Sequence, residues 1–169
     1  MKILALDPSS LRTGWAWAEG IDIVDAGLII PKASLPPLAR IEIMCGKVGE
    51  IVRARLPERI VIEIPEGKIH GRLNRQKVSG MSIYGMAVGA IWWHCYTIWD
   101  GYTVDCVGVN EWTRGTGKEE RKLIAPHLWP EYTKWAAKDR GGDMSDAISL
   151  ADFAVKNVLM QRARGAREK

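Results

Sequence analysis

The chain has 169 residues, enough for one domain with a buried core, and a net charge of +4 that permits a polyanionic partner. No run of eighteen apolar residues occurs and the start does not resemble a signal peptide, so we expect a cytoplasmic protein without a membrane segment. Cys45, Cys95 and Cys106 are far apart and form no CxxC pair, which argues against a zinc ribbon or a disulfide scaffold and predicts reduced thiols.

The first predicted strand, residues 3–6, is a continuous apolar run that stops at Asp7 and Pro8. Such a run is typical of a strand buried on both faces of a sheet, and Pro8 ends it because proline cannot donate to the ladder. A carboxylate at the end of a buried strand needs a partner, for example a cation. Asp7 could instead cap the following turn, which is a common role for Asp before Pro or Ser.

Two further strands, residues 13–19 and 21–30, are predicted to form an antiparallel hairpin. The hydroxyl-rich loop before them admits an interpretation as an actin-like or sugar-kinase phosphate loop. Such loops usually contain more glycine than the single Gly14 here. Apolar residues then recur every three or four positions over 38–56, which predicts an amphipathic helix packed on the sheet.

Residues 59–64 repeat the pattern of the first strand, with Glu63 just before Pro65. A strand, a helix and a strand in succession predict a parallel pair joined by a right-handed crossover. Asp7 and Glu63 should therefore emerge together at the carboxyl edge of the sheet, where open α/β proteins bind ligands. Two adjacent carboxylates repel each other unless a divalent cation or a proton lies between them.

Residues 67–77 form a basic segment punctuated by glycine. It could be a solvated loop or a contact for phosphates, and the pattern leaves both interpretations open. A helix is predicted over 74–99, with Gly85 and Gly89 one turn apart. Each glycine weakens a helix by about 1 kcal/mol relative to alanine. We therefore expect these glycines to allow another backbone to approach the helix closely, which would offset that cost. That backbone could belong to a second copy or to the sheet.

A strand over residues 102–109 is followed by a flexible loop and a helix over 118–128. The loop resembles a P-loop only superficially, because Trp112 stands where that motif requires its first glycine. Arg114 and Lys118 would suit an anionic substrate beside an acidic site. They are also compatible with an ordinary exposed helix start.

The last helix is predicted over residues 143–159, after a segment, 129–140, to which we assign no structure. Asp143 and Asp146 are three residues apart and share one face of its first turn. Acidic residues at a helix start also serve as caps, which explains one aspartate better than two. Residues 161–169 are basic and predicted to fray.

This order of elements resembles the RNase H-like nucleases and, more narrowly, the RuvC-type Holliday junction resolvases. The matching segments are ILALDPSSLRTGWAW at 3–17, IVIEIPEG at 60–67, VNEWTRGTGKEERKLI at 109–124 and GGDMSDAISLADFA at 141–154. The resemblance implies an α/β fold, with an RNase H-like mixed sheet of antiparallel hairpin strands plus parallel strands, flanked by helices. It implies a single nuclease domain over 1–160 and a basic C-terminal tail over 161–169.

The resemblance further implies Asp7, Glu63, Asp143 and Asp146 as metal-binding catalytic acids, with Lys118 near the scissile phosphate and Arg114 or Lys122 as a further candidate there. Carboxylate oxygens are suitable ligands for two Mg²⁺ ions, with Mn²⁺ as a substitute. The expected reaction is hydrolysis that leaves 5′-phosphate and 3′-hydroxyl ends. The implied protein is a homodimer that cuts four-way junctions during DNA recombination and repair, in a bacterial or phage-infected cytoplasm. The candidate DNA-binding residues are Arg12, Lys68, His70, Arg72, Arg75, Lys77, Arg114, Lys118 and Lys122.

The sequence departs from this family at Glu66, where cellular members carry an aromatic residue that can wedge into the junction. This departure puts a cleavage-sequence preference in doubt and suits a phage or mobile-element version. Three other hypotheses stay open: an RNase H-like nuclease acting on RNA-containing substrates, a branched-DNA-binding protein that does not cleave, and an actin-like nucleotide binder. The last would need further phosphate loops, which the sequence does not show.

Overall fold

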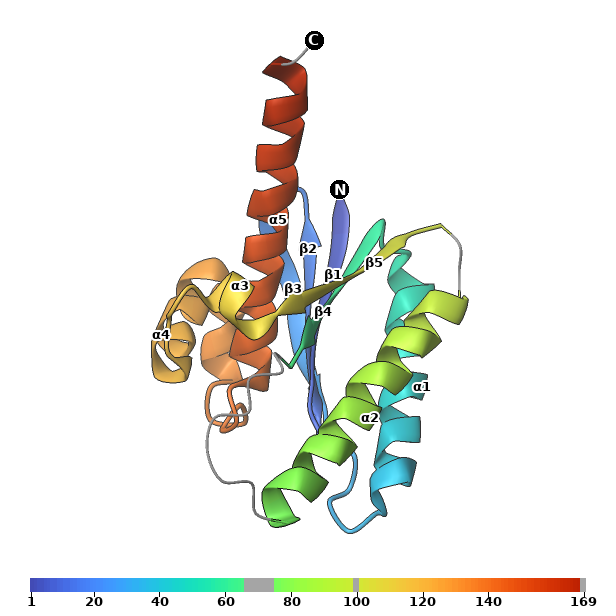
Figure 1. Cartoon of the computed structure of the whole chain (residues 1–169). Helices are drawn as coiled ribbons and strands as arrows, with labels where there is room; N and C mark the ends of the chain where they lie inside the picture. The colour runs from blue at the N-terminus through green and yellow to red at the C-terminus, as the bar shows by residue number, and fades with distance from the viewer. Residues whose placement is uncertain (66–74, 99–100, 168–169) are drawn as a thin grey trace.

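The computed structural model describes residues 1–65, 75–98 and 101–167, with side chains at all of these except 75–80 and 162–167. Five strands form one sheet in the order β3-β2-β1-β4-β5 (Figure 1). Their bounds are Lys2–Pro8 for β1, Thr13–Glu19 for β2, Asp22–Ile29 for β3, Arg59–Ile64 for β4 and Thr103–Gly108 for β5.

The sheet is mixed, as the sequence predicted. β1 pairs antiparallel with β2, which pairs antiparallel with β3. On its other side β1 pairs parallel with β4, and β4 pairs parallel with β5. β1 therefore lies in the middle of the sheet, which explains its continuous apolar run.

Helices cover both faces of the sheet, α1 and α2 on one and α4 and α5 on the other (Figure 1). The helix bounds are Pro37–Arg55 for α1, Arg75–Ile98 for α2, Val109–Thr113 for α3, Lys118–Leu128 for α4 and Asp143–Arg167 for α5, with a 3₁₀ turn η1 at Pro130–Lys134. Leu4 and Leu6 face the core under α1 and α2, whereas Ile3 and Ala5 face the core under α5. This alternation is the period of two expected of a strand.

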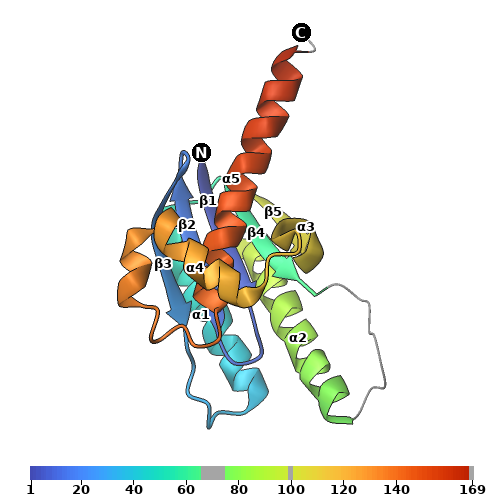
Figure 2. The same cartoon turned by 90° about the vertical axis from the view of Figure 1, so that its left-hand side faces the viewer.

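Two expectations were wrong. Residues 109–113, predicted as strand end and loop, form α3, because Trp112 is drawn into the core beside α5. The segment from residue 161, predicted to fray, continues α5 as far as Arg167. Extending an existing helix adds one hydrogen bond per residue fixed, and the segment is rich in good helix formers. Figure 2 shows this end of α5 projecting beyond the sheet.

No helix within the described residues is long and apolar enough to cross a membrane.

Candidate active site

Asp7 and Glu63 lie side by side at the carboxyl edge of the sheet. The parallel ladder between β1 and β4 ends with Leu6 opposite Ile62, and the two acids are the next residue on each strand. Both are buried. Burial raises the pKa of Asp7 well above its ordinary value, and the carboxylates of Glu63, Asp146 and Asp143 raise it further. All four predicted acids therefore interact electrostatically at one site.

A glycine brings the start of α5 to Asp7. Gly14 of β2 lies directly opposite Asp7 in the antiparallel ladder. A Cβ on Gly14 would lie 1.9 Å from the backbone oxygen of Asp143 and 2.9 Å from the backbone nitrogen of Met144. The first turn of α5 thus packs directly on the β2 backbone, and this contact sets Asp143 beside Asp7.

The N-terminus of α5 is capped by Asp139, not by the two predicted site residues. The backbone amides of Met144 and Ser145 donate to the Asp139 carboxylate at 3.1 and 2.9 Å. The Tyr132 hydroxyl donates to the same carboxylate at 2.9 Å, and Asp139 is only 1% exposed. The segment left unassigned from the sequence therefore supplies the cap. Asp143 and Asp146 lie in the first turn, where acids favour the helix dipole, but these two amides are already bonded to Asp139.

Cations pair with both acids of α5. Asp143 Oδ2 lies 2.7 Å from Arg12 Nε, and Asp146 Oδ1 lies 2.7 Å from Arg121 Nε. Lys118 Nζ lies between the two acids, 4.0 Å from Asp143 Oδ1 and 3.3 Å from Asp146 Oδ2. Burial opposes the charged form of Lys118, but Asp146, Asp143 and Asp7 outweigh it and raise its pKa. Lys118 is therefore an ammonium ion at neutral pH.

Two adjacent glycines make room for these cations. A Cβ on Gly141 would lie 2.7 Å from Asp143 Oδ2 and 2.8 Å from an Arg12 nitrogen. A Cβ on Gly142 would lie 2.6 Å from Lys118 Cε, and its φ of +77° is one that favours glycine. The Gly-Gly break before α5 therefore lets Arg12 and Lys118 reach the acids.

The loop between β1 and β2 is closed on itself. Ser9 N–H and Oγ–H donate to the Arg12 carbonyl at 2.8 and 2.9 Å, and the Leu11 and Arg12 amides donate to Ser9 Oγ at 3.4 and 3.2 Å. Buried Arg40 donates to the Ser10 carbonyl at 3.3 Å. These internal bonds occupy the amides that a phosphate loop would present to its ligand, which disfavours the actin-like interpretation.

Two further residues surround Glu63 that the sequence did not reveal. Tyr84, from α2, lies close to the Glu63 carboxylate, and burial, followed by the charges of Glu63 and Asp7, raises the pKa of Tyr84. The buried indole N–H of Trp112, from α3, lies close enough to lower the pKa of Glu63, although it makes no well-aligned hydrogen bond. Tyr84 could have been found from helix periodicity, because it precedes buried Ala87 by one turn.

The remaining candidate DNA-binding residues are placed less closely. Lys122 Nζ lies 2.9 Å from Glu119 and 3.3 Å from the Arg140 carbonyl, at the rim of the site. Arg114 instead lies over the Phe153 ring, with Cζ 5.8 Å from the ring centroid. The residues Glu66, Lys68, His70 and Arg72, and the side chains of Arg75 and Lys77, lie outside the described part of the chain.

Three cations thus face four carboxylates. Asp7 and Glu63 make no ion pair within the described residues, which is consistent with their raised pKa values. Among the described side chains, no three His, Cys, Asp or Glu groups already form a set that could hold a metal ion. The donor set is nevertheless all oxygen, and two of its carboxyl groups have no ion-pair partner among the described residues, which is the chemistry that suits a hard divalent cation.

The acid cluster should make the cation-free protein less stable as the pH rises. Burial, followed by Asp146, raises the pKa of Glu63 from its ordinary 4.5 to about 7. Glu63 therefore binds its proton more tightly in the folded chain, so its contribution to stability is complete below pH 4.5 and is lost as the pH rises through about 7. Thermal melts in chelator should show the Tm falling over this range.

In Glu63→Gln this fall should be smaller, whereas the matched change Glu42→Gln, at an exposed position on α1, should leave it unchanged. An equal fall in wild type and Glu63→Gln would show that Glu63 does not titrate in this way.

Comparison with known proteins defines the class of this fold. No protein-family model and no curated protein sequence matches the chain. Solved structures do match. RuvC of T. thermophilus in complex with a Holliday junction substrate has a TM-score of 0.71 at 18% identity, over 94% of this chain and 96% of that chain. The mixed sheet with helices on both faces is RNase H-like.

Within that class, the chain has the RuvC fold. A second Thermus thermophilus RuvC structure matches with a TM-score of 0.62 at 19% identity, over 94% of this chain and 96% of that chain. The yeast mitochondrial Holliday junction resolvase Ydc2 matches with a TM-score of 0.56 at 10% identity, over 98% of this chain and 83% of that chain. The predicted resemblance is confirmed at the level of fold.

Proposed function

We propose that this protein is a structure-selective DNA endonuclease that resolves four-way and other branched junctions, with residues 1–160 as its nuclease domain. The observation that carries the proposal is the convergence of four carboxylates at one sheet edge of a RuvC fold. Asp7 and Glu63 come from parallel strand ends, and Asp143 and Asp146 from the first turn of α5. One of the matched solved structures, RuvC of T. thermophilus, is in complex with a Holliday junction substrate, which supports a branched-DNA substrate here.

The four acids would hold two Mg²⁺ ions, or Mn²⁺ in their place. When bound, such ions activate water and stabilise the charge that develops on the phosphate and the leaving oxygen. Asp7 and Glu63 make no ion pair within the described residues, so their carboxylates would bind the metal ions without first giving up a cationic partner. The resulting hydrolysis would leave a 5′-phosphate and a 3′-hydroxyl.

The cations at this edge would bind and orient the DNA backbone. The Lys118 side chain is 44% exposed and lies between Asp143 and Asp146, so its ammonium group can move to a phosphate. Phosphate contacts fix the register of a protein on DNA without reading its sequence. We assign this role to Arg12, Lys118 and Lys122, and extend it to Lys68, His70, Arg72, Arg75, Lys77 and Arg114. The chain would act in the cytoplasm, where its three free cysteines stay reduced.

We further propose a homodimer through one face of α2, which we call the α2 face. It consists of Met81, Gly85, Met86, Gly89, Trp93 and Tyr96. A Cβ on Gly85 or Gly89 would meet nothing within 4 Å, so these glycines do not serve packing on the sheet. Trp93 and Tyr96 are 58% and 61% exposed, and exposed apolar patches mark interaction sites. Residues 81–98 contain no Asp, Glu, Lys or Arg, so two copies would bring no like charges together.

The variant Gly85→Glu tests this dimer. A single copy should tolerate the new side chain, because the space around Gly85 is open. Across a two-fold interface the same change would place two carboxylates together, so analytical ultracentrifugation should show a dimer for wild type and a monomer for the variant. Gly46→Glu, on the exposed side of α1, is the matched control and should remain dimeric. A wild-type monomer at all concentrations would exclude the dimer.

A cleavage assay on three substrates tests the function. We expect cleavage of a synthetic four-way junction with Mg²⁺ or Mn²⁺, and much slower cleavage of a linear duplex and an RNA–DNA hybrid. Ca²⁺, which is larger and less exacting in geometry, should support binding with little cleavage. Faster cleavage of the hybrid than of the junction would show that the substrate contains RNA and is not a DNA junction. Binding of the junction without cleavage under every metal condition would indicate that the protein binds branched DNA but is not a nuclease.

A further inference from the structure

We propose that Arg121 is a positioning residue that holds one oxygen of Asp146 and leaves the other to face the reaction site. This inference rests on the proposed nuclease function. From the sequence, Arg121 is one of several cations on a helix of mostly polar residues. In the structure it is buried, and it contacts three groups at once.

The contacts fix the plane of the guanidinium group. Nε lies 2.7 Å from Asp146 Oδ1, in a hydrogen-bonded ion pair. Nη1 donates to the Thr116 carbonyl, and Cζ lies 5.0 Å from the centroid of the Trp112 ring. A planar group that donates to two acceptors and has its central carbon over an aromatic ring is restricted in orientation, and lysine could not reproduce these contacts.

Arg121 and Lys118 divide the two oxygens of Asp146. Lys118 lies 3.3 Å from Oδ2 and its side chain is 44% exposed, whereas the Arg121 side chain is 11% exposed. Lys118 can therefore leave when substrate or a cation arrives, but Arg121 cannot move without breaking its other contacts. Oδ1 is committed to Arg121, so only Oδ2 of Asp146 remains available to the site.

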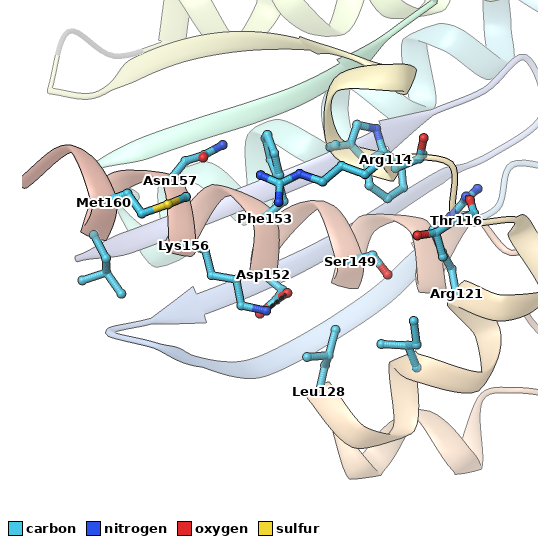
Figure 3. Close-up of a pocket in the computed structure, with 14 residues that line it drawn as sticks. Arg114, Thr116, Arg121, Leu128, Ser149, Asp152, Phe153, Lys156, Asn157 and Met160 are labelled. Atoms are coloured by element: carbon cyan, nitrogen blue, oxygen red, sulfur yellow. Dashed lines mark hydrogen bonds and ion pairs between the residues drawn. The ribbon is translucent and has the colours of Figure 1, made fainter.

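A cavity of about 580 Å³ lies behind Arg121, between α3, α4 and α5. Figure 3 shows Arg121 and Thr116 at one end of this cavity and Asn157 and Met160 at the other. Arg121 thus forms part of the wall between the cavity and the acids. Its removal would open a path by which a small cation could reach Asp146.

This path allows a test by chemical rescue. In Arg121→Ala we expect junction cleavage to fall about 10- to 100-fold, the usual cost of losing a group that orients a catalytic ligand, while junction binding in Ca²⁺ stays near wild type. Millimolar guanidinium, far below denaturing concentrations, should restore much of the rate, and urea or ammonium should not. Crystal structures of the variant should show Asp146 displaced without guanidinium and returned with it.

Arg55→Ala is the matched control, because Arg55 also pairs with an aspartate, Asp25, and lies over Trp15 and Trp17 at 5.3 and 5.6 Å. It should lose little cleavage and gain none with guanidinium. Should Arg121→Ala not fold, Arg121→Lys should fold and show a lower kcat with an unchanged KM.

Several results would overturn the inference: wild-type kcat in either Arg121 variant, an undisplaced Asp146 in Arg121→Ala, or no rescue of a folded Arg121→Ala. If the wild-type protein cleaves no substrate, the proposed function fails, and the position of Asp146 in the variant crystals still decides the role of Arg121.

Discussion

Asp7→Asn should abolish junction cleavage while junction binding persists. Asp7 is buried among the other three acids and makes no ion pair within the described residues, so its carboxyl oxygens are free to bind a cation. Loss of a group that only orients a metal ligand costs about 10- to 100-fold, so loss of a ligand itself should exceed about 100-fold. Gel shifts in Ca²⁺ and cleavage in Mg²⁺ on the same junction would measure both properties.

The same variant should be more stable than the wild type in chelator. Burial and the neighbouring acids raise the pKa of Asp7, so its charged form costs free energy in the folded chain at neutral pH, and an amide removes that cost. A rise in Tm with a loss of activity is the trade-off expected of a catalytic residue. Asp152→Asn, which breaks a surface pair with Lys156, is the control and should change neither property substantially. Undiminished cleavage by Asp7→Asn would remove Asp7 from the reaction.

Gly14→Ala should damage both stability and activity. The added methyl group would lie 1.9 Å from the Asp143 carbonyl oxygen. Neither atom can rotate away, because the Cβ is bonded directly to the β2 backbone and the oxygen belongs to the backbone of α5. Overpacking usually costs about 1 to 3 kcal/mol, and a backbone contact this short belongs at the upper end of that range or beyond it. Relief would require α5 to move off β2, which would separate Asp143 from Asp7 and could lower cleavage about 100-fold. Urea denaturation and single-turnover cleavage would measure the two effects.

Gly46→Ala is the control for that variant. Gly46 lies within α1, and a Cβ there would meet nothing within 4 Å, so alanine should stabilise the protein by up to about 1 kcal/mol. Equal stabilities of Gly14→Ala and Gly46→Ala would show that the contact between β2 and α5 is looser than the structure has it.

The strands and most helices could be predicted from the sequence because their apolar periods are regular. The paired acids at two strand ends followed from the same pattern, since a parallel pair brings its carboxyl ends together. The register of Leu6 with Ile62 confirms that Asp7 and Glu63 are neighbours. Their role as catalytic metal ligands stays a prediction.

The groups that hold the acids in place could not be predicted in this way. Asp139 caps α5 because the irregular segment before the helix folds back, and the buried Tyr132 hydroxyl holds the Asp139 carboxylate in place. The spacing of apolar residues in the sequence does not indicate such a fold. Arg121 lies on a helix whose sequence reads as exposed, and its burial depends on contacts with α3 and α5. Both are tertiary effects between elements distant in sequence.

The most direct measurement is an anomalous diffraction map of crystals soaked in Mn²⁺. We expect anomalous density within reach of Asp7, Glu63, Asp143 and Asp146 in the wild type, and its loss in Asp7→Asn. Density bound elsewhere on the molecule, or none at saturating Mn²⁺, would contradict a metal-dependent nuclease centre at this edge of the sheet.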